Sequence, residues 1–141
     1  HVAFGAIFGL ANRLQRTIDS VLPDITAKQF WVMLVLSLFD EPPTLSELAQ
    51  AADTSHQNVR QLLKKLEAKG FVKLTPDAKD SRALRIVTTP AADEWGASTD
   101  AQAEDFLSAI FAGVTPAELD RLAQTLLTIH STLDQMDHSK H

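Results

Sequence analysis

The sequence contains neither cysteine nor tyrosine. Without cysteine the chain cannot form disulfides, thiolate metal sites or cysteine-based redox sensors. Without tyrosine it has no phenolic hydroxyl for acid–base chemistry. These absences exclude whole classes of site, and the lack of cysteine is compatible with the cytoplasmic localisation that we expect.

Long apolar runs are also missing. The longest, residues 30–36, is far shorter than the ~18 residues that a membrane-spanning helix requires, so we expect no membrane partner. A chain of 141 residues has the length of one domain and can bury a substantial core. Its 45% hydrophobic and 22% charged residues are ordinary for a globular protein, which leaves the local motifs to indicate function.

No group of residues in the sequence indicates catalysis. The G-x-S-x-G, P-loop and H-E-x-x-H motifs are absent. Adjacent carboxylates such as Glu104 and Asp105 would point to different faces of a helix. His130 and His138 are too far apart to form a spaced ligand pair, and even with His141 a solvated tail is favoured over a metal site. We therefore expect no enzyme, no metal and no cofactor.

The most informative stretch starts at Thr44. Thr44 and Glu47 have the spacing of a capping box, in which each side chain satisfies a backbone N–H at a helix start. After a tight turn, either Thr54 or Ser55 can cap a second helix. This order predicts a helix-turn-helix.

The second helix has two different sides. Its core side follows the spacing i, i+3, i+4, i+7, and Gly70 suits the left-handed residue that ends such a helix. That apolar stripe consists of Val59, Leu62, Leu63 and Leu66. The other side is rich in amides, hydroxyls and arginine, which can bond adenine or guanine edges in the major groove. The residues expected to face bases are Ser55, His56, Gln57, Asn58, Arg60 and Gln61. Taken alone, this pattern favours a merely solvated polar face, and the segment that follows reverses that preference.

Two β-prone runs follow, at residues 71–74 and 84–87, and flank a polar segment. They predict a hairpin whose loop is longer than a two-residue turn. Arg82 on this loop could enter the minor groove, where narrow A·T segments concentrate negative potential. Asp80 could hold its guanidinium by a bidentate pair, although a plain turn residue beside a solvated arginine is the alternative. Hairpin and helices together favour a winged helix-turn-helix that binds DNA.

The charge distribution supports that interpretation. The whole chain has a formal net charge of −5. Residues 56–85 contain eight basic and three acidic residues, a local charge of +5, so the remainder carries −10. A basic patch in an acidic body is typical of nucleic-acid binding. The lysines expected to contact phosphates are Lys64, Lys65 and Lys73.

The flanking segments carry amphipathic patterns. Residues 2–22 place apolar side chains on one helical stripe, and further helices are expected over residues 90–111 and from Pro116 onward. The first stripe consists of Phe4, Ile7, Phe8, Ala11, Leu14, Ile18 and Val21. Such stripes could pack on their own domain, but the central segment is too small to cover all of them. A homodimer is therefore favoured.

The run TLSELAQAADTSHQNVRQLLKKLEAKGFVKL, followed by Asp80-Ser81-Arg82 and a strand ending at Thr88-Thr89, resembles the multiple antibiotic resistance regulator (MarR) family. One departure is Thr88-Thr89-Pro90, where the family more often has Leu-Thr followed by charged residues and a glycine. The resemblance implies a single domain over residues 1–141, mainly α with a small β-wing. Its winged helix-turn-helix region would be residues 26–88, with dimerisation helices at 2–22 and 90–136.

The resemblance also implies a function. Members bind pseudo-palindromic double-stranded DNA as homodimers, commonly as repressors that release DNA when a small aromatic or anionic effector binds. Phe8, Trp31 and Trp95 could line an effector pocket, although core packing is the favoured role for each. Two alternatives remain: a winged-helix module that binds protein without DNA, and an α-helical enzyme or carrier that uses a cavity between helices.

Overall fold

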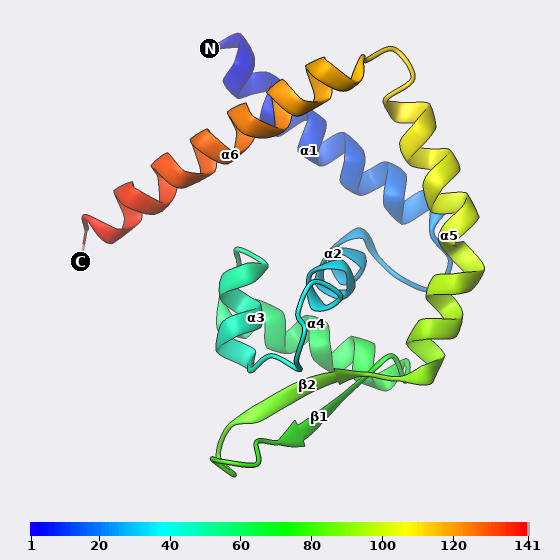
Figure 1. Cartoon of the computed structure of the whole chain (residues 1–141), viewed down its shortest axis with the longest axis vertical. Helices are drawn as coiled ribbons and strands as arrows, with labels where there is room; N and C mark the ends of the chain where they lie inside the picture. Colours follow the sequence, from blue (N-terminus) through cyan, green and yellow to red (C-terminus); the bar gives the residue numbers. More distant parts are fainter. Residues whose placement is uncertain (141) are drawn as a thin grey trace. The chain divides into compact units, whose positions relative to one another are not determined.

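The computed structural model describes residues 1–140, and these form six helices and one hairpin (Figure 1). The elements in chain order are α1 (Val2–Val21), α2 (Ala27–Leu36), α3 (Leu45–Ala51), α4 (His56–Ala68), β1 (Val72–Pro76), β2 (Leu84–Thr88), α5 (Pro90–Ile110) and α6 (Pro116–His138). This mainly helical fold with a two-stranded antiparallel wing confirms the predicted fold class. The chain divides into two compact units, His1–Thr99 and Asp100–His141, and the boundary falls within α5.

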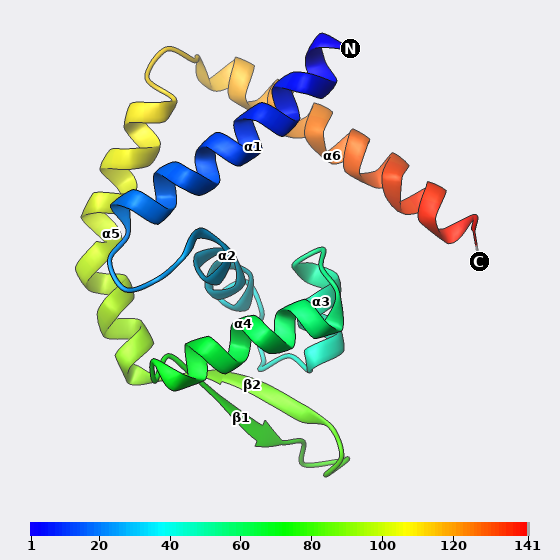
Figure 2. The ribbon, with the colours of Figure 1, turned by 180° about the vertical axis from the view of Figure 1, so that it is seen from behind.

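The core of the first unit lies between α2, α3, α4 and the hairpin, which are neighbours in both opposite views (Figures 1 and 2). Its largest fully buried side chains are Leu48, Leu63, Leu66, Ile86, Val32, Val59 and Val72. The predicted stripe on α4 is therefore confirmed, with Leu62 partly buried at its edge. In the hairpin, antiparallel pairing from Val72 opposite Thr88 to Pro76 opposite Leu84 leaves a loop at residues 77–83.

The capping box predicted at Thr44 forms, and two other helices start with the same local bonds. Full capping boxes form at Thr26 with Gln29, at Thr44 with Glu47 and at Thr115 with Glu118. Of the two candidates for α4, Ser55 is the cap: its hydroxyl accepts a hydrogen bond from the Asn58 backbone N–H at 3.2 Å. Gly70 after α4 has φ 78°, the left-handed geometry expected there.

Two helix ends differ from the sequence-based expectation. The apolar pattern of residues 30–39 predicts a helix that includes Leu38 and Phe39, yet α2 ends at Leu36. The next backbone bonds, from Leu38 to Val35 and from Phe39 to Leu36, span three residues and tighten the chain into a turn. This turn leaves Leu38 74% exposed. At the other end, α6 continues through His138 instead of residue 136, while His141 lies outside the described residues.

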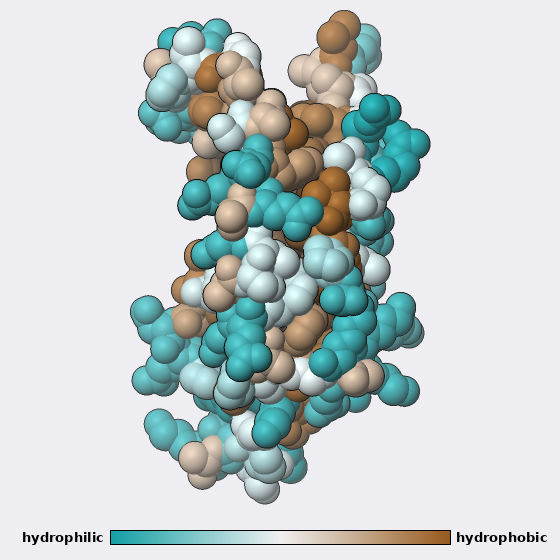
Figure 3. All heavy atoms as spheres, turned by 90° about the vertical axis from the view of Figure 1, so that its right-hand side faces the viewer, coloured by the Kyte–Doolittle hydropathy of each residue, from teal (hydrophilic) through white to brown (hydrophobic). Residues whose placement is uncertain are grey.

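Both terminal helices keep large apolar side chains at the surface. Neither α1 nor α6 buries a residue. The exposed apolar residues of α1 are Val2, Phe4, Ile7, Phe8 and Leu10, and those of α6 are Leu122, Leu126, Leu127, Ile129, Leu133 and Met136. The face drawn in Figure 3 shows hydrophobic side chains at the surface among hydrophilic ones. Within residues 1–140, no helix combines the length and apolar character needed to cross a membrane.

Truncating the α4 stripe should destabilise the first unit. Leu66→Ala removes a side chain with 0% exposure and should lower the free energy of unfolding by about 2–5 kcal/mol. Leu38→Ala removes the same atoms from an exposed site and should change the free energy of unfolding by less than about 0.5 kcal/mol. Urea unfolding followed by circular dichroism gives both values, and equal losses would contradict this description of the core.

Candidate nucleic-acid interface

The buried stripe of α4 determines which side chains face outward. Successive residues are rotated by about 100° around a helix, so Gln57, Gln61 and Lys64 lie roughly opposite the stripe that contains Val59 and Leu66. All three are exposed. The solvated face of α4 therefore presents two amides and one ammonium in adjacent turns, the donors and acceptors expected of a helix that contacts DNA.

A groove of about 450 Å³ lies beside that face, between α3, α4 and the hairpin. Arg60 and Lys64 from α4 line it together with Arg82 from the hairpin loop. Leu45 and Leu74 add apolar surface to it. The fold thus brings three predicted site residues from two separate segments to one open surface, whereas the exposed residues His56, Lys65 and Lys73 lie outside its lining.

Two predicted base-contacting residues also hold the start of α4. Ser55 is its cap, and the side-chain amide of Asn58 donates to the Thr54 hydroxyl at 2.8 Å. Asn58 is partly buried, unlike Gln57 and Gln61. These bonds give Ser55 and Asn58 a structural role, and their contact with bases stays a prediction.

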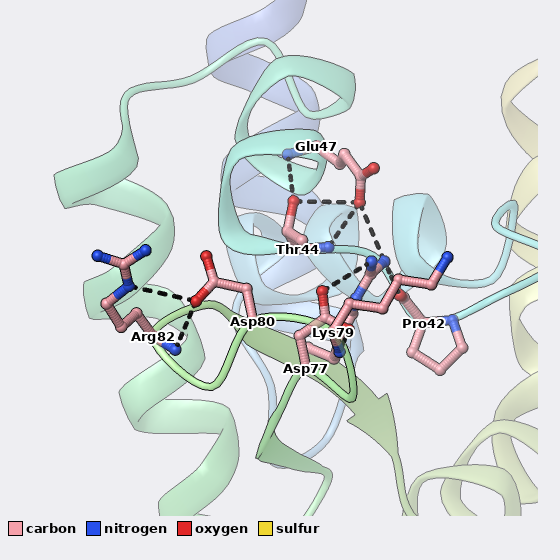
Figure 4. Close-up of polar contacts among 8 residues, drawn as sticks. Pro42, Thr44, Glu47, Asp77, Lys79, Asp80 and Arg82 are labelled. Atoms are coloured by element: carbon pink, nitrogen blue, oxygen red, sulfur yellow. Dashed lines mark hydrogen bonds and ion pairs between the residues drawn. The ribbon is translucent and has the colours of Figure 1, made fainter.

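Asp80 and Arg82 interact at the tip of the wing, as Figure 4 shows. One Asp80 carboxylate oxygen accepts from both the Arg82 backbone N–H at 3.0 Å and its Nε at 3.3 Å. The expected bidentate pair is therefore wrong. An aspartate in a turn commonly accepts a hydrogen bond from the backbone N–H two residues later. In Asp80 the oxygen that makes this bond is also the one that accepts from the guanidinium, so only one carboxylate oxygen contacts Arg82. The Arg82 side chain is 91% exposed, so the contact directs it without covering it.

Two cations of the basic patch, Arg85 and Lys69, bond to protein acceptors that the sequence does not indicate. Arg85 donates to the Pro42 carbonyl at 3.0 Å and pairs with Asp77 at 3.3 Å and Glu47 at 3.5 Å. The ammonium of Lys69 bonds to Gln29 and to the loop between α1 and α2. The acceptors on Pro42 and Gln29 lie 43 and 40 residues away in the chain, so no local pattern could indicate them.

Hydrogen bonds shift the pKa of both acids around Arg85. The Thr44 backbone N–H and hydroxyl lower the pKa of Glu47, with Arg85 contributing less. The Lys79 backbone N–H and the Arg85 guanidinium lower the pKa of Asp77. Both carboxylates are therefore held ionised where the hairpin loop meets the start of α3, and the ion pairs there persist at neutral pH.

The aromatic residues considered for an effector pocket lie in different environments. Trp95 packs against Phe71 with ring centroids 5.8 Å apart, which agrees with the favoured packing role. Trp31 donates its indole N–H to the Ala52 carbonyl at 3.1 Å, yet it is 47% exposed. Phe8 is 60% exposed. Core packing within one chain therefore does not describe Trp31 or Phe8.

Comparison with known proteins identifies the family. The profile of the MarR family matches residues 24–83, from the start of the winged helix-turn-helix region to the wing. The crystal structure of the transcriptional regulator PA3341 is 30% identical, with 94% of this chain and 98% of that chain covered and a TM-score of 0.76. The chain belongs to the MarR family of transcriptional regulators.

Two further solved structures share the fold. BpsR of Bordetella bronchiseptica, whose DNA binding is regulated by 6-hydroxynicotinic acid, is 23% identical over 91% of this chain and 98% of its own, with a TM-score of 0.75. MepR of S. aureus, solved in complex with DNA, is 19% identical over 92% of this chain and 97% of its own, with a TM-score of 0.80. No curated protein sequence matches the chain significantly.

Replacing Asp77 by a neutral residue should make the melting temperature depend less on pH in the acid range. Since its folded-state pKa is lowered, the carboxylate stabilises the fold above its unfolded-state pKa, and this contribution is lost as the pH falls through the folded-state value. Asp77→Asn should therefore lower the melting temperature at pH 7 and differ progressively less from wild type below about pH 4. Melting curves between pH 3 and pH 7 test this, with Glu41→Gln as the charge-matched control. A constant difference across that range would contradict it.

Proposed function

We propose that this MarR-family protein is a sequence-specific DNA-binding regulator of transcription. The observation that carries the proposal is the exposed polar face of α4 beside Arg82 of the wing, with cations from both segments lining one open groove. The presence of DNA in the MepR structure supports it, since the two chains share a fold.

Each group of site residues has a distinct role in the proposal. Base edges in the major groove are contacted from the first turns of α4. Ser55, His56, Gln57 and Asn58 lie at its start, and Arg60 and Gln61 lie in the following turn. Lys64, Lys65 and Lys73 neutralise phosphates, which positions the protein without specifying sequence. Arg82, directed by Asp80, enters the minor groove.

The active form in this proposal is a homodimer. The chain exposes apolar side chains along both α1 and α6, and an isolated molecule in water rarely tolerates so much exposed apolar surface. A second copy that covers them gives two-fold symmetry. Two α4 helices related in this way match a pseudo-palindromic site with half-sites about one DNA turn apart.

We further propose that the protein is a repressor controlled by a small aromatic or anionic effector. The regulation of BpsR by 6-hydroxynicotinic acid supports this class of ligand. The half-exposed indole of Trp31 offers an aromatic surface for stacking. Effector binding that changes the spacing of the two α4 helices would release DNA.

Selection from a random duplex pool tests the DNA-binding proposal. Purified wild-type protein should enrich a pseudo-palindrome, and its affinity should fall linearly with the logarithm of salt concentration. If no sequence enriches even at low salt, a winged-helix module that binds protein becomes the better account.

Arg82→Ala should weaken binding to the selected site by about 1–3 kcal/mol, because it removes a specific groove contact. The matched control is Lys79→Ala, which removes one positive charge from the same exposed loop. Electrophoretic mobility shifts at fixed salt give both affinities. Equal losses for the two variants would mean that Arg82 contributes charge alone.

Leu133→Asp should disrupt the dimer. Leu133 is 55% exposed on α6, so the change should cost a single chain little, whereas a dimer that covers this helix would have to bury an unpaired carboxylate. Sedimentation equilibrium should give wild type twice the 15.4 kDa mass of one chain, and the variant a mass shifted toward one chain. Gln124→Asp, on an exposed polar position of α6, is the control. A wild-type protein of 15.4 kDa would contradict the dimer.

A further inference from the structure

The loop between α1 and α2 accepts hydrogen bonds from two elements that are distant in the chain. Lys69, the C-terminal cap of α4, donates its ammonium to the Asp24 carbonyl. Trp95 in α5 donates its indole N–H to the neighbouring Pro23 carbonyl at 3.3 Å. Figures 1 and 2 show this loop beside both α5 and the end of α4. Two consecutive carbonyls thus connect the end of α4 and the first half of α5.

The same ammonium has a second partner inside the protein. Lys69 donates to the Gln29 side-chain oxygen at 2.9 Å. Gln29 is only 3% exposed, and the same oxygen accepts the Thr26 backbone N–H at 3.2 Å in the capping box of α2. Asp24 has φ 65°, a left-handed geometry uncommon for residues other than glycine. Lys69 therefore bonds to a loop and a helix start held in one defined conformation.

Lys69 differs in this respect from Lys64 and Lys65 of α4. All three lysines are exposed, but Lys64 lines the groove beside the polar face, whereas the ammonium of Lys69 bonds to protein oxygens. By helical spacing Lys69 lies on the side of Leu62, seven residues earlier, which is partly buried. Two of the three ammonium donors of Lys69 already bond to protein oxygens, so its charge is poorly placed to neutralise a phosphate.

Other bonds tie the same junction to α5. Phe71, which follows Gly70, packs against Trp95, and the Thr89 hydroxyl donates to the Gly70 carbonyl. The segment after α4 is therefore connected to α5 both directly and through the α1–α2 loop. A movement that carries the carboxyl end of α4 away from the α1–α2 loop would break the Lys69 bonds.

From this geometry we infer that Lys69 is a positioning residue for DNA recognition: it holds the carboxyl end of α4 on the α1–α2 loop and contacts no phosphate. The inference rests on the proposed function, in which α1 belongs to the dimer and α4 contacts bases. The Lys69 bonds then connect the loop that follows a dimer helix to the helix that recognises sequence.

The test compares Lys69→Met with Lys65→Met on the selected DNA site over a range of salt concentrations. Lys69→Met should bind about 2- to 30-fold more weakly, as found for residues that modulate a site without touching the ligand. Its salt slope should equal that of wild type. Lys65→Met, which removes a proposed phosphate contact from the same helix, should flatten the slope by about 0.9.

Further variants separate positioning from general destabilisation. Lys69→Arg can still donate to both oxygens and should restore affinity. Lys69→Met combined with Gln29→Met should bind little worse than the weaker single variant, because both remove one linked set of bonds.

Fluorescence gives a second readout. In a Trp31→Phe background the emission comes from Trp95 alone, and Lys69→Met should shift it because the same loop holds both residues. If Lys69→Met does not fold, Gln29→Met, which keeps the ammonium, should show the same weaker binding with an unchanged slope.

The outcomes distinguish this inference from the proposed function. A wild-type protein that binds no DNA overturns both. If wild type binds and Lys69→Met flattens the salt slope as Lys65→Met does, Lys69 is a phosphate contact and the inference is wrong. Wild-type affinity in Lys69→Met, or strictly additive effects with Gln29→Met, would equally overturn it and leave the DNA-binding proposal intact.

Discussion

The burial of one side of α4 is the interaction on which the rest of the first unit depends. Val59, Leu63 and Leu66 are almost completely removed from water between α2, α3 and the hairpin. Each such side chain contributes about 1.5–3 kcal/mol of transfer free energy. Because a helix is rigid, burying these three residues also fixes the rotation of α4 about its axis, and Gln57 and Gln61 must then face solvent. Core packing and the candidate DNA-binding face are two consequences of one constraint.

Polar contacts add to the core packing in holding the hairpin and α4 in place. The Arg85 guanidinium joins the hairpin to the segment before α3 and to Glu47. Lys69 joins the other end of α4 to the α1–α2 loop. Both cations belong to the basic patch by sequence, yet both are bonded to protein oxygens. The charge that remains outward is therefore smaller than the local net charge suggests, and it is concentrated on α4 and the wing.

The exposed contact between Asp80 and Arg82 has a different role. An ion pair at 91% side-chain exposure contributes little to stability, because solvent screens it. Its effect is geometric: the carboxylate oxygen that closes the turn also accepts from the guanidinium, which limits the directions that Arg82 can take. The wing thus presents an arginine that is oriented before any ligand arrives, which reduces the entropy lost on binding.

The helix starts, the buried stripe of α4, the left-handed Gly70 and the hairpin were predictable from the sequence. Each of these features depends on residues at most a few positions apart. The capping box at Thr44 consists of local hydrogen bonds, so the spacing of Thr44 and Glu47 was sufficient evidence. Which cations of the basic patch bond to protein oxygens depends instead on the packed fold. Lys69 meets Asp24 across 45 residues and Arg85 meets Pro42 across 43, and such partners become neighbours only once the core has packed. The sequence around a charged residue looks the same whether its side chain contacts solvent or bonds to a distant carbonyl. Only the folded structure distinguishes these two cases.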